Sequence, residues 1–158
     1  EAENKFVGRV PGSILIPWLD EPEWESSNRM IKNYLPKKAL KLISEGAILV
    51  DVRCEAENKF VGRVPGSILI PWLDEPEWEV DEDEFIKTFS RFDIDKDDEI
   101  ILICRSGYRS DDAGKCLVKN GFTNIAHVVS GFEGDLDEED QRGNVNGWRH
   151  DGMPWIQC

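Results

Sequence analysis

The feature that most constrains this fold is an apolar run that does not alternate with polar residues. Residues 100–103 read Ile-Ile-Leu-Ile and end at Cys104. A strand with one buried face would alternate, so an unbroken run predicts a parallel strand that is covered on both faces. A short loop and a helical pattern follow directly. The sequence therefore predicts a strand–loop–helix unit with a cysteine at the end of the strand.

Apolar strands and amphipathic helices alternate along most of the remaining chain. Strands are predicted at 47–50, 67–70, 99–103 and 124–129, and helices at 36–45, 81–92 and 110–120. Pro36 suits a first helical turn, and Gly46 suits a helix end. This order predicts an α/β fold with a mainly parallel sheet. Ligands of such sheets bind beyond the carboxyl ends of the strands, which is where Cys104 is expected.

The charge balance excludes some classes of partner. The 158 residues suit one domain, and their formal net charge is −13. An acidic protein repels the phosphates of nucleic acids and anionic lipid surfaces, so we expect no nucleic acid and no membrane partner. No apolar run approaches the roughly 20 residues needed to cross a bilayer. A small anionic substrate stays compatible, because local positive charge can outweigh the global field.

Four cysteines are present, at positions 54, 104, 116 and 158. A chain of this size can build a core without disulfides, and no spacing resembles a zinc site. We therefore expect reduced thiols, one of them reactive, with no metal and no separate cofactor. No signal-peptide pattern follows Glu1, and we expect a cytoplasmic protein.

Residues 1–25 repeat residues 55–79 letter for letter. The second copy lies between two elements of one domain, so we interpret 55–79 as native and 1–25 as an extra segment. The extra segment is an artefact of assembly, or a recent or engineered duplication. Residues 26–28 are predicted to be a linker, and 29–158 the domain. Because one strand position accepts one copy, the spare copy must hang free, pair with a sheet edge, or swap into a neighbouring molecule to form a dimer.

The chemistry is expected in the loop that begins at Cys104. Backbone N–H groups in the loop and in the first helical turn lack partners within the helix, so a curled loop directs them at the sulfur. The helix dipole, Arg105 and Arg109 add positive charge, and all favour the nucleophilic thiolate. Gly107 gives the loop conformational freedom. The alternative is a small buried cysteine that only packs at a strand end.

The other cysteines and the histidines receive structural interpretations. Cys116 falls on the inward face of its helix and is predicted to be core. Cys54 follows a predicted strand and could lie near the site, although inert packing is the favoured interpretation. His127 and His150 have no catalytic spacing, and we assign both to structure or surface.

Several motifs together resemble a rhodanese-like domain. They are Leu-Val-Asp-Val-Arg at 49–53, Gly-Arg-Val-Pro-Gly-Ser at 62–67, Cys-Arg-Ser-Gly-Tyr-Arg at 104–109, Gly-Phe-Glu-Gly-Asp at 131–135, Asn-Gly-Trp at 146–148 and Gly-Met-Pro-Trp at 152–155. The resemblance spans about residues 29–155, and the cysteine loop is its most specific part. One departure is Arg63, where the family usually carries histidine. The resemblance implies a five-stranded, mainly parallel sheet flanked by helices on both faces.

The resemblance also implies a sulfurtransferase. Cys104 would take a sulfane sulfur from a small anionic donor such as thiosulfate, hold it as a covalent persulfide, and pass it to cyanide or a thiol, including a protein thiol. The resemblance implies that Arg105 binds the donor, that Arg109 closes the loop, and that Asp51 orients the loop or an arginine. Arg53 would support the site. A cradle for the persulfide would be formed by the backbone N–H groups of Arg105, Ser106, Gly107, Tyr108 and Arg109.

Two other functions remain open at this stage. One is a persulfide relay or a non-enzymatic interaction module on the same fold. The other is a cysteine-dependent phosphatase. Related phosphatases have a loop one residue longer, which is wide enough for a phosphate. The six residues from Cys104 to Arg109 suit a single sulfur better.

Overall fold

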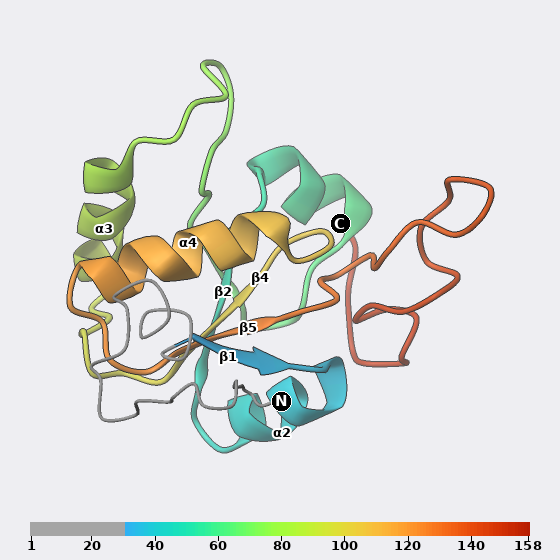
Figure 1. Ribbon diagram of the computed structural model, residues 1–158, viewed down its shortest axis with the longest axis horizontal. Coiled ribbons are helices and arrows are strands. Elements are labelled where there is room, and N and C mark those ends of the chain that lie inside the picture. Colours follow the sequence, from blue (N-terminus) through green and yellow to red (C-terminus); the bar gives the residue numbers. More distant parts are fainter. Residues whose placement is uncertain (1–30) are drawn as a thin grey trace, which may run out of the picture.

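In the computed structural model, which describes residues 31–158, a five-stranded sheet lies between helices (Figure 1). Its strands are β1 (Ile31–Tyr34), β2 (Ile48–Asp51), β3 (Ile68–Leu69), β4 (Ile100–Ile103) and β5 (Ile125–Val128). Their order is β1-β5-β4-β2-β3, and every neighbouring pair is parallel. The predicted fold class is confirmed. The predictions for the duplicate at 1–25 and the linker at 26–28 lie outside the described residues.

β4 is the central strand, and its sequence reflects that position. All four of its residues are buried. Ile100 and Leu102 belong to the core on one face of the sheet, whereas Ile101 and Ile103 belong to the core on the other. Covering both faces removes the need for alternating polar residues, which explains the unbroken apolar run.

Helices cover the two faces unequally (Figure 1). They are α2 (Pro36–Ser44), α3 (Glu82–Arg91) and α4 (Tyr108–Lys119). α2 packs Ala39 against one face. α3 and α4 pack Phe85, Phe89 and Leu117 against the other. The Asp81 side chain accepts a hydrogen bond from the Glu84 N–H and caps the start of α3.

Element boundaries differ from the sequence prediction in places that affect the site. β1 was not among the predicted strands. α4 begins at Tyr108, two residues earlier than predicted, so the cysteine loop is shorter. A π-helical turn, η1 (Glu57–Val61), follows β2. β3 is an edge strand bound to β2 alone, and the two strands pair over two residues.

The C-terminal segment folds back onto the sheet. Trp148 is fully buried, and its indole Nε1–H donates to the Pro154 carbonyl at 2.8 Å. Arg63 and Ile156 form an antiparallel bridge. These contacts give the late Asn-Gly-Trp and Gly-Met-Pro-Trp motifs a packing role. Among the helices of residues 31–158, none has the length and apolar character required to cross a bilayer.

Candidate active site

Cys104 is the first residue after β4, at the carboxyl end of the most buried strand. Its side chain is 1% exposed and contacts the core between the sheet, α3 and α4. The sulfur is nonetheless not in a purely apolar environment. The Gly107 N–H donates to Sγ at 3.1 Å, and the Ser110 N–H donates at 3.3 Å. Both amides come from the start of α4, so the positive end of the helix dipole faces the sulfur.

Two glycines allow the loop to curl this tightly. Gly107 has φ +109°, and a Cβ atom there would lie 2.3 Å from the Val129 carbonyl oxygen. Gly131 has φ +72°, and its Cβ atom would lie 2.4 Å from the Arg105 carbonyl oxygen. Both positions combine a left-handed backbone with close backbone contact, so only glycine fits. The β5–Gly131 segment thus holds the loop from outside.

Arg109 is anchored by Glu57 of η1. Its two terminal nitrogens donate to the Glu57 carboxylate at 2.7 and 3.0 Å. Burial alone would raise the pKa of Glu57, but the hydrogen bonds and charge of Arg109 outweigh it and lower that pKa to about 2. The carboxylate thereby fixes the position of the Arg109 guanidinium beside the loop. Glu57 was not among the predicted site residues.

Asp51 orients an arginine, but the partner is Arg53 and not a loop arginine. Arg53 Nε donates to Asp51 at 2.9 Å, and Arg53 Nη2 donates to Asp51 at 2.6 Å and to the Gly62 carbonyl at 2.7 Å. Both side chains are buried, and the guanidinium stacks 4.4 Å from the centroid of the Phe132 ring. This pair fixes the turn after β2, from which η1 and Glu57 project.

The remaining loop side chains lie toward solvent. Tyr108 is 81% exposed, Arg105 is exposed and Ser106 is half-buried. The structure therefore brings Gly107, Arg109 and Cys104 together, whereas it leaves the Arg105 side chain at the surface. The predicted cradle for an outer persulfide sulfur, and donor binding by Arg105, stay predictions.

Three further polar side chains lie behind the sulfur, connected one to the next. Ser110 Oγ is 3.4 Å from Cys104 Sγ and 2.8 Å from His127 Nδ1. His127 Nε2 lies 2.9 Å from Asn33 Oδ1 on β1. Burial lowers the pKa of His127. Sequence reasoning missed this contact. The sequence does predict strands that end at Cys104 and near His127. Had these two strands been placed side by side in the parallel sheet, Ser110 and His127 would have been expected to lie close together.

The other buried thiols differ from Cys104. Cys54 donates to Glu57 Oε1 at 3.3 Å, next to the Glu57–Arg109 pair, and burial raises its pKa. Cys116 lies inside α4, where burial raises its pKa to about 11. Both shifts favour the protonated thiol, which is the less nucleophilic form.

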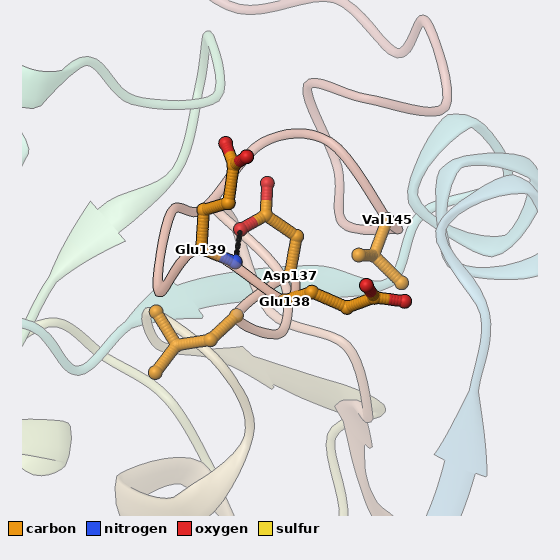
Figure 2. A pocket seen from close by; sticks show the side chains of 5 residues that line it. Asp137, Glu138, Glu139 and Val145 are labelled. Carbon is orange, nitrogen blue, oxygen red and sulfur yellow. Dashed lines mark hydrogen bonds between the residues drawn. The ribbon is translucent and has the colours of Figure 1, made fainter.

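A surface hollow of about 560 Å³ lies in the segment that follows β5 (Figure 2). It is lined by Leu136, Asp137, Glu138, Glu139 and Val145. The Asp137 carboxylate accepts from the Glu139 and Gln141 N–H groups and from Asn144 Nδ2, so it braces its own loop. No residue that contacts Cys104 lines this hollow. Within residues 31–158, no cluster of three or more His, Cys, Asp or Glu side chains could hold a metal ion.

A buried cysteine that accepts from helix N-terminal amides at the end of a central parallel strand defines a class of α/β domains with a cysteine loop at the carboxyl edge of the sheet. Comparison with known proteins narrows that class, because a rhodanese-like domain model matches residues 35–138. The chain belongs to the rhodanese-like domain family.

Individual relatives support this assignment. An uncharacterized protein of Rickettsia conorii is 31% identical over 134 residues, covering 79% of this chain and 97% of the relative. The crystal structure of Rv0390 from Mycobacterium tuberculosis is 36% identical, with a TM-score of 0.69, and the match covers 80% of this chain and 98% of that one. A thiosulfate sulfurtransferase GlpE of Pseudomonas savastanoi is 29% identical over 102 residues, which cover 65% of this chain and 84% of GlpE.

Proposed function

We propose that the protein is a thiosulfate sulfurtransferase with Cys104 as its sulfur carrier. The Cys104 thiolate attacks the outer sulfur of thiosulfate, a new S–S bond forms, and sulfite leaves with the electron pair of the broken S–S bond. A thiophilic acceptor, cyanide or a thiol, then attacks the outer persulfide sulfur. The acceptor keeps that sulfur, and the thiolate returns.

One observation carries the proposal: two backbone N–H groups donate to Cys104 Sγ, from Gly107 at 3.1 Å and Ser110 at 3.3 Å. Amide donors that are fixed before reaction stabilise negative charge on sulfur without reorganising. The Arg109 guanidinium, which is held by Glu57, adds positive charge nearby. Exposed Arg105 is placed to attract a small anion.

Loop size favours sulfur over phosphate. The Ser110 N–H, which directly follows the six residues from Cys104 to Arg109, already donates to the sulfur at 3.3 Å, so the loop closes around a single sulfur atom. A phosphatase of the related type would need one more residue. Phosphatase activity is therefore the weaker alternative.

Intact mass spectrometry after exposure to thiosulfate tests the proposal. We expect the wild type to gain one sulfur atom, and Cys104→Ser to gain none. Cys116→Ser is the matched control, because this residue is an equally buried cysteine away from the loop, and it should gain the sulfur normally. Sulfur uptake by Cys104→Ser would reject Cys104 as the carrier.

A persulfide relay is the second candidate, and two exposed aromatic side chains favour it. Tyr108 is 81% exposed immediately after Gly107, and Phe60 is 64% exposed on the turn that carries Glu57. Aromatic side chains at a surface are common contacts for a protein partner. A relay would load with sulfur but release it to a protein thiol much faster than to cyanide. Equal release to both acceptors would reject the relay.

The duplicated segment suggests self-association. β1 and β3 are opposite edges of the sheet, four strand spacings or about 19 Å apart. Residues 26–30 reach at most about 20 Å when extended. Position 25 corresponds to residue 79, and the segment between β3 and α3 extends away from β1 (Figure 1). Replacement of 55–79 by residues 1–25 in their own molecule would therefore require an almost fully extended connection.

We therefore propose that residues 1–25 take the place of 55–79 in a second copy, which makes a swapped dimer. Light scattering after size exclusion should report a dimeric fraction for the full chain and a monomer after deletion of 1–25. An identical monomer in both samples would reject the swap.

A further inference from the structure

Three polar side chains form a continuous chain from the Cys104 sulfur to the surface. Ser110 Oγ is 3.4 Å from Cys104 Sγ, His127 Nδ1 is 2.8 Å from Ser110 Oγ, and Asn33 Oδ1 is 2.9 Å from His127 Nε2. Ser110 and His127 are buried, whereas Asn33 is exposed on β1. The chain therefore leads from a buried nucleophile to solvent, on the side of the loop away from Arg109.

The charges around His127 favour a neutral imidazole. Asp111 and Lys115 are the charged groups that act on it, both from α4, and they form an ion pair with each other at 3.0 Å. Their effects on the imidazole oppose one another, and burial disfavours the charged ring. A neutral imidazole carries one N–H, so its two nitrogens must play different roles.

The His127 ring has one N–H and the Ser110 hydroxyl has one hydrogen, so the tautomer of His127 is linked to whether Cys104 is a thiol or a thiolate. With Nε2–H donating to Asn33 Oδ1, Nδ1 accepts from the Ser110 hydroxyl, and Oγ is free to accept from the Cys104 thiol. With the proton on Nδ1, the imidazole donates to Ser110 Oγ, and the hydroxyl hydrogen can donate to a Cys104 thiolate in preference to the neutral Gly107 carbonyl, which lies 3.2 Å from Oγ. The exposed Asn33 amide can turn and donate to Nε2.

We propose that His127 is a positioning residue, whose tautomer directs the Ser110 hydroxyl toward Cys104 when the sulfur is negatively charged. On ionisation, the thiol proton passes to Oγ, the hydroxyl proton passes to Nδ1, and the Nε2 proton leaves to water beside Asn33. The sulfur keeps the negative charge and gains a third donor besides the Gly107 and Ser110 amides. The inference rests on the proposed function and explains how a 1% exposed thiol loses its proton.

Paired substitutions of His127 test the proposal. His127→Phe keeps a ring but removes both nitrogens. His127→Asn keeps a polar atom near the Nδ1 position that can donate or accept. The rate of Cys104 alkylation by iodoacetamide is measured from pH 5 to 10 in a Cys54→Ser, Cys116→Ser, Cys158→Ser background. We expect the His127→Phe profile to move to higher pH, with a roughly tenfold slower rate at neutral pH, as for loss of one hydrogen bond to a charged group. His127→Asn should restore the rate to within about twofold.

A double-mutant cycle separates positioning from packing. If His127 acts through the hydroxyl, His127→Phe should have no further effect once Ser110→Ala is present. A wild-type profile for His127→Phe, or equal losses in the Phe and Asn variants, would overturn the proposal. So would additive effects of His127→Phe and Ser110→Ala.

A spectroscopic measurement on the unsubstituted protein does not depend on any variant folding. Nitrogen-15 chemical shifts of the neutral His127 ring should report Nε2–H while Cys104 is a thiol and Nδ1–H after Cys104 ionises. One tautomer at every pH would overturn the proposal. Alkylation and NMR do not require sulfur transfer, so a tautomer change without sulfur uptake would reject the proposed function alone.

Discussion

Two buried cysteines, one facing the start of α4 and one inside it, have opposite surroundings. Cys104 faces the start of the helix, where two N–H groups donate to its sulfur. Cys116 lies inside the same helix, where its thiol meets Glu82 at 3.5 Å and burial raises its pKa to about 11. Both side chains are less than 5% exposed. Burial opposes ionisation of a thiol, and we propose that the backbone N–H groups directed at the Cys104 sulfur make this cysteine, and not Cys116, the nucleophile.

The largest expected effect on stability and on Cys104 reactivity follows from a substitution that prevents the cysteine loop from adopting its tight turn at Gly107. Gly107→Ala places a Cβ atom 2.3 Å from the Val129 carbonyl oxygen, at φ +109°. We expect the free energy of unfolding to fall by about 2–4 kcal/mol, from backbone strain and overpacking. Alkylation of Cys104 at pH 6.5 should slow by more than about tenfold, because the amide no longer reaches the sulfur.

Gly121→Ala is the matched control at the other end of α4. Gly121 also has a positive φ, +92°, but its Cβ atom would meet only the flexible Lys96 side chain at 3.5 Å. Urea unfolding should show a smaller loss of stability, and Cys104 alkylation should stay unchanged. Equal loss of reactivity in both variants would mean that general destabilisation, and not the amide, controls Cys104.

The next effect concerns the charge held beside the loop. Arg109→Met removes the guanidinium that Glu57 anchors and leaves that carboxylate partly buried without its partner. We expect sulfur uptake from thiosulfate to slow roughly tenfold, as for loss of a charged hydrogen-bonding group. Arg91→Met breaks an exposed ion pair with Glu84 on α3 and should leave uptake unchanged. Mass spectrometry at timed intervals gives both rates.

Sequence reasoning recovered what is local. The strand, loop and helix around Cys104 are contiguous, so an apolar run, a glycine and two arginines were enough to predict them. β1 was missed because Ile-Lys-Asn-Tyr has only one fully buried residue and carries little periodic signal. Its strand form depends on pairing with β5.

The missed site contacts are all distant in sequence. Arg109 and Glu57 are separated by 52 positions, and His127 and Asn33 by 94. Asp51 was expected to orient the loop or an arginine. In the structure it binds Arg53, which is two positions away. The Asp51 carboxylate is therefore occupied by a neighbouring arginine. Only the fold shows that Arg109 has a different partner, Glu57.

A smaller effect tests the Cys116 side of the comparison through alkaline stability. The ordinary thiol pKa is 9.0, and burial raises that of Cys116 to about 11. A raised pKa means that the folded state holds the proton more tightly, so this stabilisation is complete below about pH 9 and is lost as the pH rises through about 11. Cys116→Ala should therefore lose stability less steeply between pH 9 and 11. Urea unfolding at a series of pH values measures how the free energy of unfolding of the wild type and of Cys116→Ala depends on pH. Identical pH dependence in the two proteins would show that burial of Cys116 does not cause the loss of stability at alkaline pH.

The last expected effect lies at acid pH and tests what anchors Arg109. The pKa of Glu57 is lowered from 4.5 to about 2, so the folded state favours the carboxylate. This stabilisation is complete above about pH 4.5 and is lost as the pH falls through about 2. Glu57→Gln should make the free energy of unfolding less dependent on pH in that window. Glu84→Gln is the control, because the Glu84–Arg91 pair is exposed and weakly coupled to folding. If Glu57→Gln leaves the pH dependence of the free energy of unfolding unchanged, Glu57 does not anchor Arg109. The backbone N–H groups of α4 alone would then have to account for the difference in reactivity between Cys104 and Cys116.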